Sequence, residues 1–89
     1  MLIEFDTAKR EAILAARGLD MADAGAVFSG PVITVDDDRK GYGEPRKITV
    51  GFLSGRMVVL IWTPRGEGRR IISLRKANER EQRFYGPRF

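Results

Sequence analysis

The hydrophobic pattern of this chain changes its period at Gly30-Pro31, and this change constrains the fold strongly. Before it, apolar residues recur at helical spacing; after it, they alternate or run continuously, as they do in strands. A short opening strand is also expected at Leu2-Ile3-Glu4-Phe5. We therefore expect an α+β fold with two N-terminal helices and one C-terminal helix around a mostly antiparallel sheet.

Two helices are predicted before the change of period. Asp6 is placed to cap a helix over residues 7–17, because its carboxylate can accept free N–H groups of the first turn. Gly18 can end this helix in the left-handed conformation. Asp20 is placed to cap a second helix, so that the two form a helical hairpin that ends at Gly30-Pro31.

The second part of the chain is predicted to be strands followed by a helix. Strands are expected at residues 32–35, 48–52, 57–62 and 70–74, with loops at 36–45 and 63–68 and a turn at Ser54-Gly55. The run from Met57 to Trp62 is continuously apolar, which indicates a strand covered on both faces. A closing helix begins near Asn78 and ends at Gly86-Pro87. With only 89 residues, we expect a single domain over residues 1–89.

The chain contains no cysteine and no histidine. Disulfides, thiol catalysis, the usual zinc ligands and the usual general base are therefore excluded. Asp36-Asp37-Asp38 raises the question of a metal site, but three consecutive carboxylates cannot all point at one ion. The acidic run fits a solvated loop better, and we expect neither a metal nor a cofactor.

The basic residues are concentrated in the second half of the chain. Lys and Arg number 16 against 12 Asp and Glu, a net charge of +4, and the acids gather before Asp38. Such asymmetry favours a polyanionic partner, and nucleic acid is the first candidate. The N-terminus does not resemble a signal peptide, and no apolar run approaches the ~20 residues of a membrane span. A soluble, cytoplasmic protein without membrane contact is expected.

Three segments together resemble the BrnT toxin family. They are Phe5-Asp6 with Lys9, Gly43-Glu44-Pro45-Arg46, and Arg70-Ile71-Ile72-Ser73-Leu74-Arg75-Lys76-Ala77-Asn78 followed by Glu81 and Tyr85. The resemblance implies a fold similar to that of RelE-type ribonucleases and a type II toxin that inhibits translation by cleaving RNA without a metal. It also implies a BrnA-like antitoxin, a mixed oligomer with it and possible ribosome association. Relatives often carry a histidine where this chain has Arg17.

Candidate site residues follow from the resemblance and from the chemistry of arginine. Guanidinium groups offer forked donors that match phosphate oxygens, so Arg46, Arg70 and Arg75 are candidates for gripping a scissile phosphate. Because Arg70 and Arg75 are five residues apart, a regular strand would send them to opposite faces unless it bends or ends between them. The remaining candidates are Tyr85 for catalysis and Lys9, Arg65, Arg69 and Lys76 for RNA binding.

Part of the C-terminal match has a structural explanation. Asn78 and Glu81 form a capping-box pattern, which explains their presence by helix initiation rather than by chemistry. Tyr85 lies four residues after Glu81, on the same helix face, and fits a packed aromatic residue better than an acid or base.

The general base and the activity itself remain open at the level of sequence. Arginine does not lose its proton in proteins, so the base candidates are Glu44, Lys9, Lys76 and Tyr85, with no reason to prefer one. Catalysis by positioning and electrostatics alone is another possibility. Two alternatives to a ribonuclease are a non-catalytic nucleic-acid-binding module and an inactive toxin relic retained to bind the antitoxin.

Overall fold

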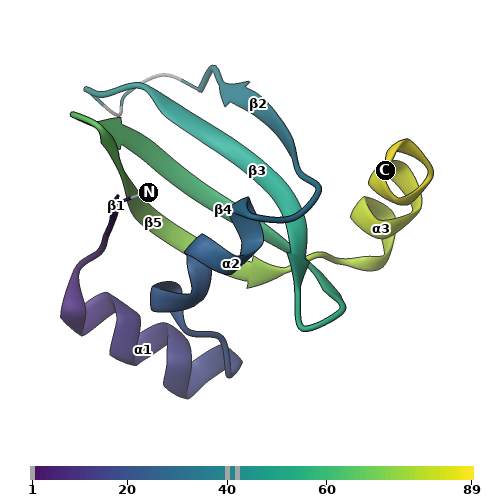
Figure 1. Ribbon diagram of the computed structural model, residues 1–89, viewed down its shortest axis with the longest axis horizontal. Coiled ribbons are helices and arrows are strands. Elements are labelled where there is room, and N and C mark those ends of the chain that lie inside the picture. Colours follow the sequence, from purple (N-terminus) through teal and green to yellow (C-terminus); the bar gives the residue numbers. More distant parts are fainter. Residues whose placement is uncertain (1, 40, 42) are drawn as a thin grey trace.

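In the computed structural model, which describes residues 2–39, 41 and 43–89, five strands form one mixed sheet in the order β1-β5-β4-β3-β2 (Figure 1). The strands are β1 (Leu2–Glu4), β2 (Ile33–Asp37), β3 (Arg46–Leu53), β4 (Arg56–Arg65) and β5 (Gly68–Lys76). The helices are α1 (Thr7–Arg17), α2 (Ala24–Phe28) and α3 (Glu79–Tyr85), with short 3-10 turns η1 (Met21–Asp23) and η2 (Gly86–Arg88). Strands β2 to β5 form an antiparallel meander, and β1 pairs with β5 in parallel. The predicted α+β class and the mostly antiparallel sheet are confirmed.

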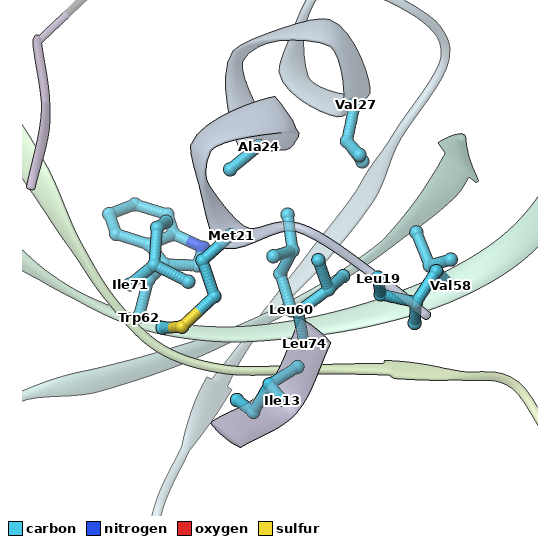
Figure 2. Packing of buried hydrophobic residues seen from close by; sticks show 10 residues of the cluster. All are labelled: Ile13, Leu19, Met21, Ala24, Val27, Val58, Leu60, Trp62, Ile71 and Leu74. Atoms are coloured by element: carbon cyan, nitrogen blue, oxygen red, sulfur yellow. The ribbon is translucent and has the colours of Figure 1, made fainter. Parts of the chain in front are cut away.

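The two faces of the sheet have different coverings. Helices α1 and α2 pack on one face, here called the helix face, while α3 lies beyond the end of β5 (Figure 1). Ten buried residues form the core between these helices and the sheet, among them Met21, Val27, Leu60 and Leu74 (Figure 2). The opposite face, here called the open face, carries a smaller buried cluster near α3. The prediction that the β4 run is covered on both faces is therefore right only in part, since Ile61 is half-buried on the open face.

The first helix begins and ends as predicted. Asp6 Oδ1 accepts hydrogen bonds from the Ala8 and Lys9 amides at 2.9 and 3.4 Å. Gly18 ends α1 with a φ of 69°, a left-handed conformation that glycine adopts without steric cost. The parallel pairing of β1 with β5 holds the segment before α1 in the sheet.

The second helix was predicted to begin directly after Asp20, and this prediction is wrong in detail. Asp20 does cap, by accepting the Ala22 amide at 2.9 Å, but it caps the 3-10 turn η1, and α2 begins only at Ala24. Short 3-10 turns are common at helix ends. Here the turn carries Met21, which is completely buried against the sheet.

The acidic run was predicted to be a loop, but its first two residues belong to β2. Asp36 pairs with Lys47 and Asp37 pairs with Arg46 across the β2–β3 ladder. Opposite charges facing each other across two strands are favourable, which explains why β2 continues past Val35. Of the loop expected from there to Pro45, residues 40 and 42 lie outside the described part of the chain.

The predicted loop at residues 63–68 is also mostly strand. β4 continues to Arg65 and β5 begins at Gly68, so that only Gly66 and Glu67 form the turn. Pro64 is tolerated within β4 because β3 begins at Arg46 and does not extend alongside it. The extended hairpin carries Thr63 and Arg65 onto the sheet.

Candidate functional site

A row of polar side chains crosses the open face near the β4–β5 turn. Thr63 on β4 pairs with Arg70 on β5, and Arg46 on β3 lies one step beyond the Lys47–Trp62 pair, beside Thr63. Paired residues on neighbouring strands point to the same face. Arg46, Thr63 and Arg70 therefore form one line across three strands, which we call the arginine row.

The arginine row continues to both edges of the sheet with an acidic residue on each side. On β2, Asp37 pairs with Arg46, and on β1, Glu4 pairs with Arg70. Strands lie about 4.8 Å apart, so the backbones at Arg46 and Arg70 are roughly 10 Å apart. The two arginines thus flank a central position that no acid occupies.

The middle of the row is buried and hydrogen-bonded to the backbone. Thr63 is only 2% exposed, and its hydroxyl donates a 2.6 Å hydrogen bond to the Pro45 carbonyl. This bond ties the residue before β3 to the centre of the sheet. Glu44 lies in the same segment, with its Oε1 3.6 Å from an Arg46 guanidinium nitrogen. The contact from Thr63 therefore holds both Arg46 and Glu44 at the edge of the row.

A β-bulge in β5 places Arg75 on the same face as Arg70. Ile61 pairs with Ser73 and Trp62 pairs with Ile71, so Ile72 has no opposite residue. An extra residue in one strand shifts the alternation of side chains by one. Arg75 consequently pairs with Val59 on the open face. The sequence-based condition that the strand must bend between the two arginines is met by this bulge.

Arg75 is nevertheless occupied by an ion pair with α3. Its two terminal nitrogens bind the two carboxylate oxygens of Glu81 at 2.7 and 2.9 Å. This hydrogen-bonded pair lowers the pKa of Glu81 and raises the pKa of Arg75. Glu81 also accepts the Asn78 amide at 2.9 Å, while Asn78 accepts the Glu81 amide at 2.8 Å, which confirms the capping box. Arg75 therefore anchors the first turn of α3 to the sheet.

Tyr85 packs at the end of the open face. It is half-buried against the small cluster of Val50, Met57, Val59 and Ala77, in agreement with the expectation of a packed aromatic residue. Its ring also meets that of Phe84 edge-on, with centroids 4.9 Å apart.

The four residues expected to bind RNA are dispersed. Arg65 is exposed two residues beyond Thr63, on the same face as the arginine row. Lys9 is exposed on α1 and lies on the other side of the sheet. Lys76 pairs with Val58 at the far end of the helix face. The structure thus joins Arg65 to the row but not Lys9 or Lys76.

Arg69 has a packing role on the helix face. Its guanidinium carbon lies 4.1 Å from the centre of the Phe28 ring and 4.6 Å from that of Trp62. Cation–π contact with two rings holds this half-buried side chain among aromatic residues of the core. Its neighbour Arg70 points to the opposite face.

Sequence reasoning missed Thr63, which it assigned to a loop. The alternation Val59, Ile61, Thr63 on the open face was the available signal, but Pro64 and two glycines suggested a loop instead. It also missed that Arg17 donates a 2.9 Å hydrogen bond to the Leu74 carbonyl, and this contact leaves no signal in the sequence.

A comparison with known protein families gives a match over most of the chain. Residues 5–81 match the family of BrnT, the ribonuclease toxin of a type II toxin–antitoxin system. The chain belongs to the BrnT toxin family. Membership implies an antitoxin partner, as for type II toxins in general. A search of curated proteins gave no match.

Two further observations concern the described part of this BrnT-family chain. None of its helices is long and apolar enough to cross a membrane. Residues 2–39, 41 and 43–89 also contain no group of three or more acidic, histidine or cysteine side chains able to hold a metal ion.

Proposed function

We propose that this protein is a metal-independent endoribonuclease that inhibits translation in the cytoplasm and is neutralised by a BrnA-like antitoxin in a mixed oligomer. The observation that carries the proposal is the arginine row, in which Arg46 and Arg70 flank Thr63 on the face of the sheet opposite α1 and α2. In this proposal the fold is also similar to that of RelE-type ribonucleases.

The arginine row fits the charge that develops during RNA transesterification. The ribose 2′-oxygen attacks the adjacent phosphorus, the bond from phosphorus to the 5′-oxygen breaks, and a 2′,3′-cyclic phosphate forms. Negative charge accumulates on the phosphoryl oxygens in the transition state, where fixed guanidinium forks stabilise it. Arg46 and Arg70 supply these forks, Arg65 continues the cationic path, and Arg75 holds the first turn of α3 against the sheet through Glu81.

Glu44 is the general base in this proposal. Of the four candidates it alone contacts the arginine row, through the 3.6 Å approach to Arg46. Its carboxylate would take the proton of the 2′-hydroxyl, and the leaving 5′-oxygen would gain a proton from water. Lys9 and Lys76 lie away from the row, and Tyr85 is packed at the far end of the open face.

Cleavage of a defined single-stranded RNA in EDTA tests the proposal. We expect the wild type to produce fragments that end in a 2′,3′-cyclic phosphate. Arg46→Ala and Arg70→Ala should each lower the rate by about 10²-fold, because each removes a donor to the transition state. Arg80→Ala, which changes an exposed arginine of α3, is the control and should retain the wild-type rate. Absence of cleavage both with and without ribosomes would contradict the proposal.

A non-catalytic RNA- or DNA-binding module is the second candidate, because the same row would bind phosphates without chemistry. It predicts binding that weakens steeply with salt, through counterion release, while the nucleic acid remains intact. The third candidate is an inactive toxin relic retained to bind the antitoxin. Growth of cells after induction of the protein tests it, because an inactive relic would not be toxic.

A further inference from the structure

A hollow of about 520 Å³ lies between the β3–β4 turn and α3, away from the arginine row. Phe52, Met57 and Ala77 form its apolar part, and Arg56, Lys76 and Gln82 contribute its polar side chains. Pockets of this size hold small ligands, with a few polar groups that fix the orientation. No acidic residue lines the hollow within the described chain.

Two cations at this hollow are available to an anion. Neither Arg56 nor Lys76 forms an ion pair in the described residues, and both side chains are exposed. The same two residues also line a second hollow of about 560 Å³, where Asp20 and Asp23 contribute negative charge. An anion is therefore favoured in the first hollow over the second.

Gln82 presents a fixed amide to the same hollow. Its side-chain nitrogen donates a 3.0 Å hydrogen bond to the Ala77 carbonyl, which sets the orientation of the amide. The amide oxygen can accept a hydrogen bond, and the second N–H can donate one. A ligand with a polar edge, an apolar flat face and an anionic group would match all three features.

We propose that this hollow binds one nucleotide of a single-stranded RNA, with its phosphate between Arg56 and Lys76 and its base against Phe52, Met57 and Ala77. Gln82 contacts the edge of the base and gives the site a preference among bases. Stacking and apolar contact with single-stranded bases are common in RNA recognition. The inference rests on the proposed ribonuclease function and names a substrate subsite for it.

The position of the hollow suits one RNA strand that reaches both sites. Lys76 pairs with Val58, whereas Arg70 pairs with Thr63, further along β4. At about 3.3 Å per strand residue this separation is roughly 17 Å along β4, and because Lys76 lies on the helix face, the RNA would cross the end of the sheet between the two sites. The hollow would therefore bind a nucleotide outside the scissile bond, where it affects the choice of sequence.

Binding is measured separately from cleavage with an RNA that cannot be cut. A fluorescent eight-nucleotide 2′-O-methyl RNA lacks the attacking hydroxyl, and its anisotropy reports affinity alone. We expect the double variant Arg56→Gln/Lys76→Gln to bind about tenfold more weakly. The salt slope should also fall by about 0.7, because the two side chains together hold one phosphate and each phosphate contact on a single strand contributes about 0.7. Arg80→Gln/Arg83→Gln removes the same charge from α3 and should change neither quantity.

The nucleotide itself is identified by NMR with the four nucleoside 5′-monophosphates. We expect at least one of them to shift the Gly55, Ala77 and Gln82 signals, and Gln82→Ala to reduce the differences among the four affinities. Inorganic phosphate producing the same shifts, or no shift at these residues, would overturn the inference. Tighter binding of a hexaglutamate peptide than of the RNA would overturn it in favour of an acidic protein partner. If the RNA binds here and unmodified RNA is not cleaved, only the ribonuclease proposal fails.

Discussion

Three arginines of β5 have three different surroundings. Arg69 lies against the rings of Phe28 and Trp62, Arg70 belongs to the arginine row, and Arg75 is held by both oxygens of Glu81. The strand geometry separates Arg69 from Arg70, and the bulge then returns Arg75 to the face of Arg70. Of the three, Arg70 alone has neither an ion pair nor a ring contact within the described residues.

Glu81→Gln should loosen α3 without unfolding the protein. Glutamine retains an oxygen that can accept the Asn78 amide, so the capping box can survive while the ion pair with Arg75 is lost. Because both side chains are partly exposed, we expect a loss of about 0.5–1 kcal/mol. Amide hydrogen exchange along α3 measures it, with Glu79→Gln as the control because Glu79 lies 3.9 Å from Arg83 on the exposed side. Equal exchange in both variants would contradict the anchoring role of Arg75.

Asp20 should make the stability depend on pH in the acid range. Its hydrogen bonds with Arg10, and then with the Ala22 amide, lower its pKa from 3.8 to about 2. A carboxylate with a depressed pKa stabilises the folded state above the unfolded pKa, and this contribution disappears as the pH falls toward the folded pKa. Urea unfolding between about pH 5 and pH 2 should therefore show a shallower pH dependence in Asp20→Asn than in the wild type. Asp23→Asn is the control, and identical slopes for the wild type and Asp20→Asn would refute the prediction.

At the scale of elements, α2 and β3 are joined by close packing at a glycine. A Cβ at Gly51 would lie 2.7 Å from Val27 Cγ1 and 3.1 Å from Val32 Cγ1. Val27 is completely buried, and branched side chains have few alternative rotamers in a helix. The helix can therefore approach the sheet only because β3 has no side chain at this position.

Gly51→Ala should consequently destabilise the protein by about 1–3 kcal/mol, as expected for overpacking of a filled core. Gly25→Ala is the matched control, because Gly25 lies in α2 and a Cβ there meets nothing within 4 Å. Alanine should improve the helix at that position by about 0.5–1 kcal/mol. Thermal unfolding of the two variants measures both effects, and equal shifts would contradict the packing described at Gly51.

The sequence predicted most elements because their signals are local. The cap at Asp6, the left-handed Gly18 and the capping box of Asn78 and Glu81 depend on residues a few positions apart. The bulge at Ile72 and the extension of β2 into the acidic run depend on which strand lies opposite. Such pairings are not visible in the spacing of a single sequence, so the faces of Arg70 and Arg75 could be stated only as a condition.

At the scale of the whole molecule, the division of the sheet into two faces organises the candidate site. Helices α1 and α2 provide the buried core on the helix face, which leaves the open face with the arginine row. The sequence identified Arg46 and Arg70 through the resemblance, but their alignment through Thr63 required the register of three strands. It also placed Arg69 among the RNA-binding candidates, whereas Arg69 contacts aromatic rings of α2 and β4.

The role of Arg70 at the reacting phosphate is tested most directly by the single-turnover rate of RNA cleavage in EDTA. The rate is measured for the wild type, Arg70→Lys and Arg70→Gln. Lysine keeps the positive charge but loses the planar fork, and glutamine loses both. We expect the wild type to be fastest, Arg70→Lys to be slower, and Arg70→Gln to lose about 10²-fold or more. Circular dichroism should confirm that both variants fold. Wild-type rates in both folded variants would contradict the claim that the arginine row stabilises the reacting phosphate.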